Sequence, residues 1–375
     1  MKVVIIFYSH RDFSIKPLFV KPPYLGNWNI VTNTEETLSD LWRQKWKLIK
    51  KNSIMVCCIG SLWKVWIAWE NLCTNQQINS VYFDEKLVEF KYWYYFCTTL
   101  EKIMTLMANK SVVAIINKSI FSTIKIPLPP LPTQKLIVQK LDLSFEKIDK
   151  SIEITKKNLE NLEQLNKSIL EEVFRKWEYE EKMLWEISEI INGWTPDTQE
   201  LLYWDWDIFW ITPKDMWKLK SVYVDNTIRK ISKEWLKNSS AKIFPINSIV
   251  LSSRAPIWYL AINTVPMSTN QWCKAIVPSK ILETKYLYYF LFNSVKLLND
   301  LGSWTTFKEL SSWKLKEVFI PLPPLPKQKE IVTYLTSVFE KNKSLKSEYE
   351  RKLKDLEELK QSLLKEAFEW RLVKE

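Results

Sequence analysis

The stretch Pro127-Leu-Pro-Pro-Leu-Pro132 occurs a second time in this chain, as Pro321-Leu-Pro-Pro-Leu-Pro326. The two copies begin 194 residues apart (321 minus 127), and the same offset persists downstream, where residues 168–174 match residues 362–368. Proline fixes φ and lacks a backbone donor, so each stretch is expected to form a stiff, extended connector. A long segment rich in charged helix formers follows each one. The chain is therefore predicted to be one globular part and one long helix, written twice.

The long segment after each connector carries a heptad pattern. In the first, spacings of four and three alternate, which is typical of helices that pack side by side. Its seam residues are Ile148, Ile152, Thr155, Leu159, Leu162, Asn166, Ile169 and Val173. The weaker second seam is Asn342, Lys346, Tyr349, Leu353, Leu356, Lys360, Leu363 and Ala367. Asn166 and Lys360 match in the duplication, and a polar seam residue sets register. We expect two spacer helices, each roughly 65 Å long, rather than two unrelated solvated helices.

The segments before the helices read as short strands, because apolar and β-branched runs alternate with turn formers. Residues 52–55 match 247–250, and 74–76 match 269–271, at an offset of 195. We expect a strand over 184–191, whose counterpart in the first copy would precede Met1. The predicted fold class is α+β. Its parts are a first globular domain over 1–126 with an atypical or truncated start, a hinge and helix over 127–182, a second globular domain over 183–320, and a hinge and helix over 321–375.

The composition points to a polyanionic partner. The formal net charge is +11, and lysine and arginine gain affinity for nucleic acid by releasing counterions. No apolar run approaches the roughly 18 residues that cross a bilayer, so no membrane span is expected. The five cysteines are odd in number and lack paired metal spacing. They predict free, buried thiols in a reducing cytoplasm.

Glycine is scarce and tryptophan abundant, with 4 glycines and 20 tryptophans. Several tryptophans stand where turns or helix ends usually require glycine. We hypothesise that UGA codons meaning glycine were translated as tryptophan at Trp63, Trp66, Trp69, Trp185, Trp194, Trp206, Trp217, Trp235, Trp258, Trp272, Trp304, Trp313 and Trp370. Those in aromatic, strand-like settings are expected to be genuine, namely Trp93, Trp204 and Trp210. The alternative is a natural aromatic surface that stacks on bases. UGG codons at these positions would rule out the recoding.

Catalytic constellations are not found in the sequence. The single histidine, His10, has no partner residues around it, and neither a phosphate-binding loop nor a metal motif occurs. Lys21-Pro-Pro-Tyr24 faintly resembles the element with which amino-methyltransferases hold a flipped adenine, but lysine cannot accept the required hydrogen bond. We therefore expect a reader rather than an enzyme, with two globular domains contacting two separated patches of DNA.

The order of several motifs resembles one known family. The second copy contains Asn192-Gly-Trp-Thr-Pro196, Tyr203-Trp-Asp-Trp-Asp-Ile-Phe-Trp-Ile-Thr-Pro-Lys-Asp-Met216, Ser252-Ser-Arg-Ala-Pro-Ile-Trp258, Thr269-Asn-Gln271 and the proline stretch with its helix. This order closely resembles the specificity subunit of type I restriction-modification enzymes, from about Asn52 onward. The family writes glycine at Trp194, Trp206, Trp258 and Trp304.

The resemblance implies two target-recognition domains that each read one half of a bipartite, asymmetric DNA sequence. The two long helices would pack antiparallel as a ruler between the half-sites. Two methyltransferase subunits would dock on the helices, and a helicase-nuclease restriction subunit would join them. The partners would use S-adenosylmethionine, ATP and Mg, while this chain itself would hold no cofactor or metal and would be non-catalytic.

Base reading requires polar side chains that project from loops. In the second domain we select Lys214, Ser252, Ser253, Arg254, Tyr259, Thr305, Thr306 and Lys308, and in the first Ser61, Lys64 and Lys110. Asn75-Gln76 and Asn270-Gln271 recur although the two domains should read different bases, so we expect a structural role for them. Two alternatives stay open: a coiled-coil adaptor that bridges proteins without DNA, and a decayed remnant that reads one half-site.

Overall fold

Two long helices dominate the computed structural model, α5 (Leu131–Arg175) and α12 (Leu325–Phe368). Both begin inside the repeated proline stretch, at its fifth residue, and the proline that follows is tolerated because first-turn backbone donors have no helical acceptor. The structure describes residues 18–24, 34, 47–62, 64–68, 70–108, 113–175, 179–254, 256–304 and 308–369. The two predicted spacer helices are thus confirmed.

The chain divides into two compact units. The first unit comprises Met1–Lys156 and Glu350–Glu375, and the second unit comprises Lys157–Tyr349. Each unit therefore contains the start of one long helix and the end of the other. Because this division cuts both helices, it does not test the predicted boundaries between globular domains and hinges, which stay predictions.

The first unit is built on a small antiparallel sheet with strand order β3-β2-β5. Its strands are β2 (Ile54–Cys57), β3 (Val65–Ile67) and β5 (Ile78–Val81), beside the parallel pair β1 (Phe19–Val20) and β4 (Cys73–Thr74). Its short helices are η1 (Pro22–Tyr24), α2 (Phe90–Thr98), α3 (Glu101–Met107) and α4 (Lys118–Phe121). In β2, alternate residues enter two different buried clusters, which is the period of two that a strand imposes.

The second unit has a larger, mixed sheet in the order β7-β14-β11-β12-β9. Its strands are β7 (Ser188–Asn192), β9 (Tyr223–Val224), β11 (Ile249–Ser252), β12 (Leu260–Asn263) and β14 (Cys273–Pro278). A three-stranded sheet accompanies it, in the order β10 (Arg229–Ile231), β8 (Trp204–Ile211) and β13 (Met267–Thr269). The two-stranded pairs are β6 (Glu181–Met183) with β17 (Phe319–Pro321), and β15 (Ser303–Trp304) with β16 (Lys308–Glu309).

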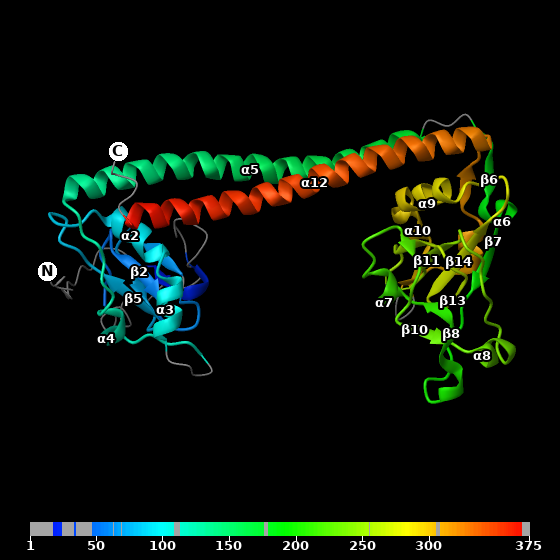
Figure 1. The fold of residues 1–375 in the computed structure, drawn as a ribbon, viewed down its shortest axis with the longest axis horizontal. Helices are drawn as coiled ribbons and strands as arrows, with labels where there is room; N and C mark the ends of the chain where they lie inside the picture. Colours follow the sequence, from blue (N-terminus) through cyan, green and yellow to red (C-terminus); the bar gives the residue numbers. More distant parts are fainter. Residues whose placement is uncertain are drawn as a thin grey trace. The chain divides into compact units, whose positions relative to one another are not determined.

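Helices cover this larger sheet on one side. Ile249 and Leu251 of β11 share a buried cluster with Tyr286 of α9 (Thr284–Asn293), whereas Val250 faces the three-stranded sheet. Figure 1 shows α9 and α10 (Val295–Leu301) beside β11 and β14. The remaining short helices are α6 (Leu184–Ile187), η2 (Leu201–Tyr203), α7 (Pro213–Met216), α8 (Lys233–Lys237) and α11 (Ser312–Lys316). The second unit is therefore a layered α+β domain, as predicted.

One predicted strand is wrong in its first half. Residues 184–187 form one helical turn, α6, and only the following residues form β7. Leu184 and Ile187 are both buried, and their spacing of three residues suits a helical turn rather than an alternating strand. The apolar run therefore turns once before it joins the sheet.

Within each unit the two long helices pair side by side. In the second unit Asn342 Nδ2 donates to Asn166 Oδ1 at 2.6 Å, and Lys346 lies 3.2 Å from Glu163. Because the α12 number rises as the α5 number falls, the helices run antiparallel. In the first unit the nearly buried Lys360 pairs with Asp149. Apolar seam residues pack around that pair, among them Ile148, Ile152, Leu353, Leu356 and Leu363.

Each unit is completed by the final turns of a long helix. Phe368 of α12 packs against Tyr92 and Phe96 of α2, with ring centroids 5.2 and 5.4 Å apart. In the second unit Phe174 of α5 packs against Tyr286 and Phe290 at 5.6 and 5.5 Å. Phe368 and Phe174, which correspond in the duplication, thus pack on equivalent helices of the two units, α2 and α9.

A buried glutamine fixes each proline stretch to its unit. Gln328 Oε1 accepts from Glu283 N at 2.8 Å, and its Nε2 donates to Ile281 O and Pro323 O at 2.9 and 2.8 Å. Gln134 makes the equivalent three bonds, to Glu89 N, Leu87 O and Pro129 O. The hydroxyls of Tyr92 and Tyr286 donate to Pro127 O and Pro321 O, both at 2.8 Å. Each proline stretch is therefore held to its unit by hydrogen bonds. We call the three bonds of Gln134, and the three equivalent bonds of Gln328, the glutamine joint.

Candidate nucleic-acid interface

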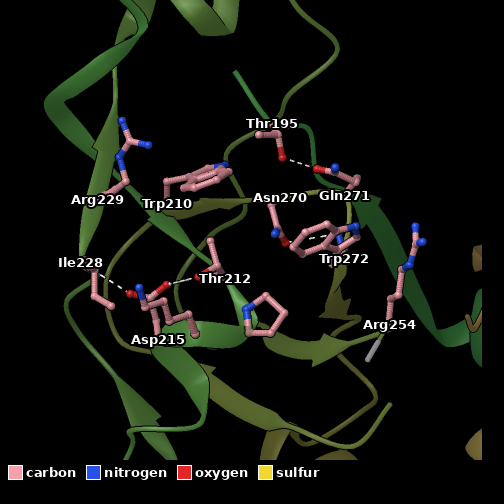
Figure 2. Close-up of a pocket in the computed structure, with 12 residues that line it drawn as sticks. Thr195, Trp210, Thr212, Asp215, Ile228, Arg229, Arg254, Asn270, Gln271 and Trp272 are labelled. Carbon is pink, nitrogen blue, oxygen red and sulfur yellow. Dashed lines mark hydrogen bonds between the residues drawn. The ribbon is translucent and has the colours of Figure 1, made fainter. Parts of the chain in front are cut away.

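A cavity of about 530 Å³ opens in the second unit, and Figure 2 shows the side chains that line it. Its walls come from the loop after β7, the end of β8, the start of α7, strand β10 and the loops that follow β11 and β13. Aromatic rings and cations are prominent in the lining, namely Trp210, Trp272, Lys214, Arg229 and Arg254. The site therefore combines flat apolar faces with positive charge.

Asp215 supports the cavity wall through its own hydrogen bonds. Its Oδ2 accepts from Thr212 N at 2.9 Å, and its Oδ1 accepts from Ile228 N at 2.7 Å (Figure 2). These bonds tie the turn before α7 to the start of β10. Both carboxylate oxygens of this buried side chain thus hold the backbone in place. The other charged side chains of the lining are cations, of which Lys214 is exposed and Arg229 and Arg254 are half-buried.

A close backbone crossing pins one edge of the cavity. At Gly193 a Cβ atom would lie 2.1 Å from Thr269 O, closer than any side chain can approach, so this position requires glycine. The next residue, Trp194, donates its N–H to the same oxygen at 3.0 Å and accepts from Trp210 Nε1 at 3.1 Å. Thr195 then reaches the amide of Gln271 (Figure 2). Hydrogen bonds next to this crossing thus hold the lining side chains of Trp210 and Gln271 in place.

Each of the two lining arginines has a neighbour that orients its guanidinium group, whereas the lining Lys214 is exposed. The guanidinium of Arg229 lies over the ring of Trp204, 3.3 Å from its centroid, and a stacked arginine is pre-organised. Arg254 Nη1 lies 3.7 Å from Glu309 Oε2. Planar guanidinium groups suit phosphates and guanine edges, while aromatic faces stack on bases. The lining thus has the side-chain types that contact phosphates and bases.

The structure places the predicted base-reading residues of the second domain unevenly. Lys214 and Arg254 line the cavity. Tyr259, which packs on Trp258 at 4.8 Å, and Lys308 of β16 are partly exposed outside it. Thr305 and Thr306 lie outside the described residues. Their contacts with DNA stay predictions.

Two serines need correction. Ser252 and Ser253 are fully buried, so neither projects into a groove. Ser252 Oγ donates to Pro256 O at 2.7 Å and accepts from Tyr259 N at 2.9 Å, which closes the turn after β11. Ser253 Oγ is buried without a hydrogen-bond partner. The sequence motif predicted an exposed serine, whereas Ser252 is buried and stabilises the turn after β11 through its own hydrogen bonds.

In the first unit the selected residues do not assemble into a comparable site among the described residues. Ser61 is half-buried, and Lys64 donates to Pro22 O at 3.0 Å. Lys110 lies outside the described residues. The recurring asparagines do have the expected structural role, because Asn75 Oδ1 and Asn270 Oδ1 each accept from the backbone N–H two residues later. That prediction is confirmed for the two asparagines.

Sequence reasoning missed Arg229, Trp210 and the cavity contribution of Gln271. Arg229 and Trp210 face each other because β10 pairs antiparallel with β8 in that register. No short motif carries this pairing. The sequence did show that β8 is rich in aromatic residues, and Trp204 and Trp210 were predicted to be genuine. It did not show that Trp210 lines a cavity.

The cysteines agree with the prediction of buried free thiols. All five are free and buried. Burial raises the pKa of the Cys58 thiol to about 11 and that of Cys273 to about 12, so both stay protonated at neutral pH. No group of three or more histidine, cysteine, aspartate or glutamate side chains in the described ranges could hold a metal ion. No helix in those ranges has the length and apolar character to cross a membrane.

Exposure differs between the two predicted classes for most of the described tryptophans. The three expected to be genuine, Trp93, Trp204 and Trp210, are at most 9% exposed. Six suspected substitutions are 43–69% exposed, namely Trp185, Trp194, Trp217, Trp258, Trp272 and Trp313. Trp66 is an exception, being buried in the core. Trp235 is half-buried. No described tryptophan has positive φ, so backbone strain does not distinguish the classes. The recoding stays a hypothesis; Trp63, Trp69 and Trp370 lie outside the described residues.

Comparison with known families identifies the duplication. The sequence model of the family described as type I restriction modification DNA specificity domain matches residues 18–164 and again residues 176–355. These two matches span most of the chain, and one falls on each copy of the repeat.

Individual relatives agree with this match. The chain is 40% identical over 162 residues to the type I restriction enzyme MjaIX specificity subunit of Methanocaldococcus jannaschii, covering 42% of this chain and 37% of the relative. It is 31% identical over 171 residues to the EcoR124I/EcoR124II specificity subunit of Escherichia coli, covering 43% and 41%. The chain thus spans about two fifths of the length of these two relatives.

Solved structures share the fold. A chain from a study of the complex assembly and conformational transition of the type I R-M system has a TM-score of 0.77 at 20% identity, covering 95% of this chain and 92% of that one. The HsdS subunit from Thermoanaerobacter tengcongensis has a TM-score of 0.65 at 19% identity, covering 96% and 91%. At these identities the likeness concerns the fold alone.

Proposed function

The chain belongs to the type I restriction modification DNA specificity domain family, and from this premise we propose that it is a DNA sequence-recognition subunit of a type I restriction-modification complex. Each unit reads one half of a bipartite, asymmetric target. The chain itself is non-catalytic. The observation that carries the proposal is the tandem family match, one for each copy of the duplication.

The cavity of the second unit supports this role. Lys214, Arg229 and Arg254 supply positive charge around aromatic faces, and the whole chain carries a net charge of +11. Phosphate contacts would provide affinity and position, while contacts to base edges would provide sequence preference. A protein-bridging adaptor would have no use for such a lining.

The partners belong to the same proposal. Two methyltransferase subunits dock on the paired helices, and a restriction subunit with helicase and nuclease activity joins the assembly in the cytoplasm. S-adenosylmethionine, ATP and Mg are bound by those subunits and not by this chain. The exposed, highly charged outer faces of α5 and α12 are suited to such docking.

The test is selection from a random pool of double-stranded DNA by the full chain together with methyltransferase subunits. We expect recovery of a two-part sequence with a fixed gap, and an affinity that falls steeply with salt. Recovery of no preferred sequence at moderate salt would overturn the DNA-reading function and favour an adaptor. Recovery of a single half-site would identify a remnant that reads with one unit.

A further inference from the structure

A short backbone bridge closes the cavity edge in the second unit. Arg254, just after β11, forms an isolated antiparallel bridge with Glu309 of β16. Beside it, Leu310 N donates to Ser253 O at 2.9 Å. The bridge therefore fixes the backbone of Arg254 while its side chain lines the cavity (Figure 2).

The first unit contains the same bridge with different side chains. Ile59 forms an isolated antiparallel bridge with Ile115, and Ile116 N donates to Cys58 O at 2.9 Å. The offsets are 195 (254 minus 59) and 194 (309 minus 115), the same values that relate the rest of the two copies. The backbone frame is thus duplicated, while a charged pair in one copy is an apolar pair in the other.

The difference between the charged pair and the apolar pair is informative, because residues that hold the backbone are the same in both copies. Asn75 and Asn270 are identical and make the same turn, and Gln134 and Gln328 make the same joint. Two readers of different half-sites need an identical frame and different side chains where they touch bases. The bridge position satisfies both requirements.

We propose that this bridge is a specificity-determining position in each unit, with Arg254 reading a guanine and Ile59–Ile115 contacting a thymine methyl group. The inference rests on the proposed function. The Arg254 side chain is 31% exposed and lines the cavity, so a ligand in the cavity can contact it. The guanidinium fork matches O6 and N7 of guanine in the major groove.

Glu309 is a positioning residue for Arg254. The 3.7 Å separation between Arg254 Nη1 and Glu309 Oε2 exceeds hydrogen-bond length, so the carboxylate orients the guanidinium by charge. In the first unit Ile115 is 37% exposed beside the half-buried Ile59. This apolar surface suits the methyl group that distinguishes thymine in the major groove.

The experiment exchanges the two pairs in the full chain. The variants R254I/E309I and I59R/I115E are each used in the random-pool selection with methyltransferase subunits. We expect R254I/E309I to lose a guanine preference of about ten-fold at one position of one half-site, with the other half-site unchanged. We expect I59R/I115E to replace thymine by guanine at one position of the opposite half-site.

The conservative variant Arg254→Lys guards against a folding defect. Lysine keeps the charge but loses the planar fork, so the guanine preference should fall while affinity averaged over sequences is kept. Circular dichroism of each variant reports folding; if an exchanged variant is unfolded, Arg254→Lys alone decides.

Three outcomes would overturn the inference. The first is folded variants that select the parental sequence. The second is a uniform loss of affinity across all sequences with a smaller salt slope, because that result identifies Arg254 as a phosphate contact. The third is a parental chain that selects no sequence, which removes the proposed function as well. The first two leave the proposed function standing.

Discussion

The two units are alike where they hold the long helices and different in their larger sheets and in the cavity of the second unit. Both have the glutamine joint, the tyrosine bond to the first proline and the phenylalanine that seals α2 or α9. Only the second has the five-stranded sheet and the cationic cavity among the described residues. The two copies therefore share the contacts that join each unit to the long helices, and they differ in the sheet and cavity that we propose read DNA.

The glutamine joint should be the most sensitive shared feature. Replacing Gln328 by leucine leaves three backbone groups without partners, at Glu283 N, Ile281 O and Pro323 O. We expect the free energy of unfolding to fall by about 4 kcal/mol, since each orphaned buried group costs roughly 1–3 kcal/mol. Urea unfolding of Gln328→Leu measures this.

The matched variant Gln134→Leu should cost a similar amount, because its three bonds are equivalent. The exposed neighbours give the controls, Lys329→Leu and Lys135→Leu, which should change stability little. A loss in one copy without a comparable loss in the other would show that the joints are not equivalent.

Replacing a glycine by alanine should destabilise the second unit more than the first. Gly193→Ala places a Cβ 2.1 Å from a carbonyl oxygen at the cavity edge, and we expect a loss of about 3 kcal/mol. Gly60→Ala in the first unit meets no atom within 4 Å, but its φ of +81° disfavours other residues, so about 1 kcal/mol is expected. Thermal and urea unfolding compare the two; equal losses would mean that the close crossing relaxes.

The helix pair uses different polar contacts in the two units. The amide pair Asn166–Asn342 and the ion pair Asp149–Lys360 both replace apolar seam contacts. Lys360→Leu should stabilise by about 1 kcal/mol, because Asp149 is 58% exposed and regains water. The double change of both asparagines to leucine should stabilise similarly while loosening register. Stability by urea and register by cysteine cross-linking test this; lower stability in either case would show that polar contacts hold the pair together.

The smallest expected effect is a loss of stability in alkaline solution, caused by the buried thiols of Cys58 and Cys273. Burial raises the pKa of Cys58 to about 11 and of Cys273 to about 12, against an ordinary value of 9.0. The unfolded chain then releases protons before the folded chain does, so stability is full below pH 9.0 and falls as pH rises through the folded values. Urea unfolding as a function of pH measures the slope. Cys273→Ala should make it shallower, and an unchanged slope would contradict the assignment.

The sequence was sufficient for features that repeat, because duplication doubles a weak signal. The proline stretch, the helix that follows it and the seam at Asn166 and Lys360 were all read from matching offsets. It was insufficient where strands bring distant residues together, as with Trp210 and Arg229. It also misplaced Ser252, since a serine that closes a turn and a serine that faces DNA look the same in a loop motif.

The central claim is that the paired helices set the distance between two DNA-reading units, and one insertion tests it most directly. Seven residues added after Glu160 and seven after Tyr349 keep the heptad pattern on both helices and lengthen the pair by about 10 Å. In target selection with methyltransferase subunits, the account predicts unchanged half-sites and a gap wider by about three base pairs, at roughly 3.4 Å each. An unchanged gap with a folded variant would contradict it.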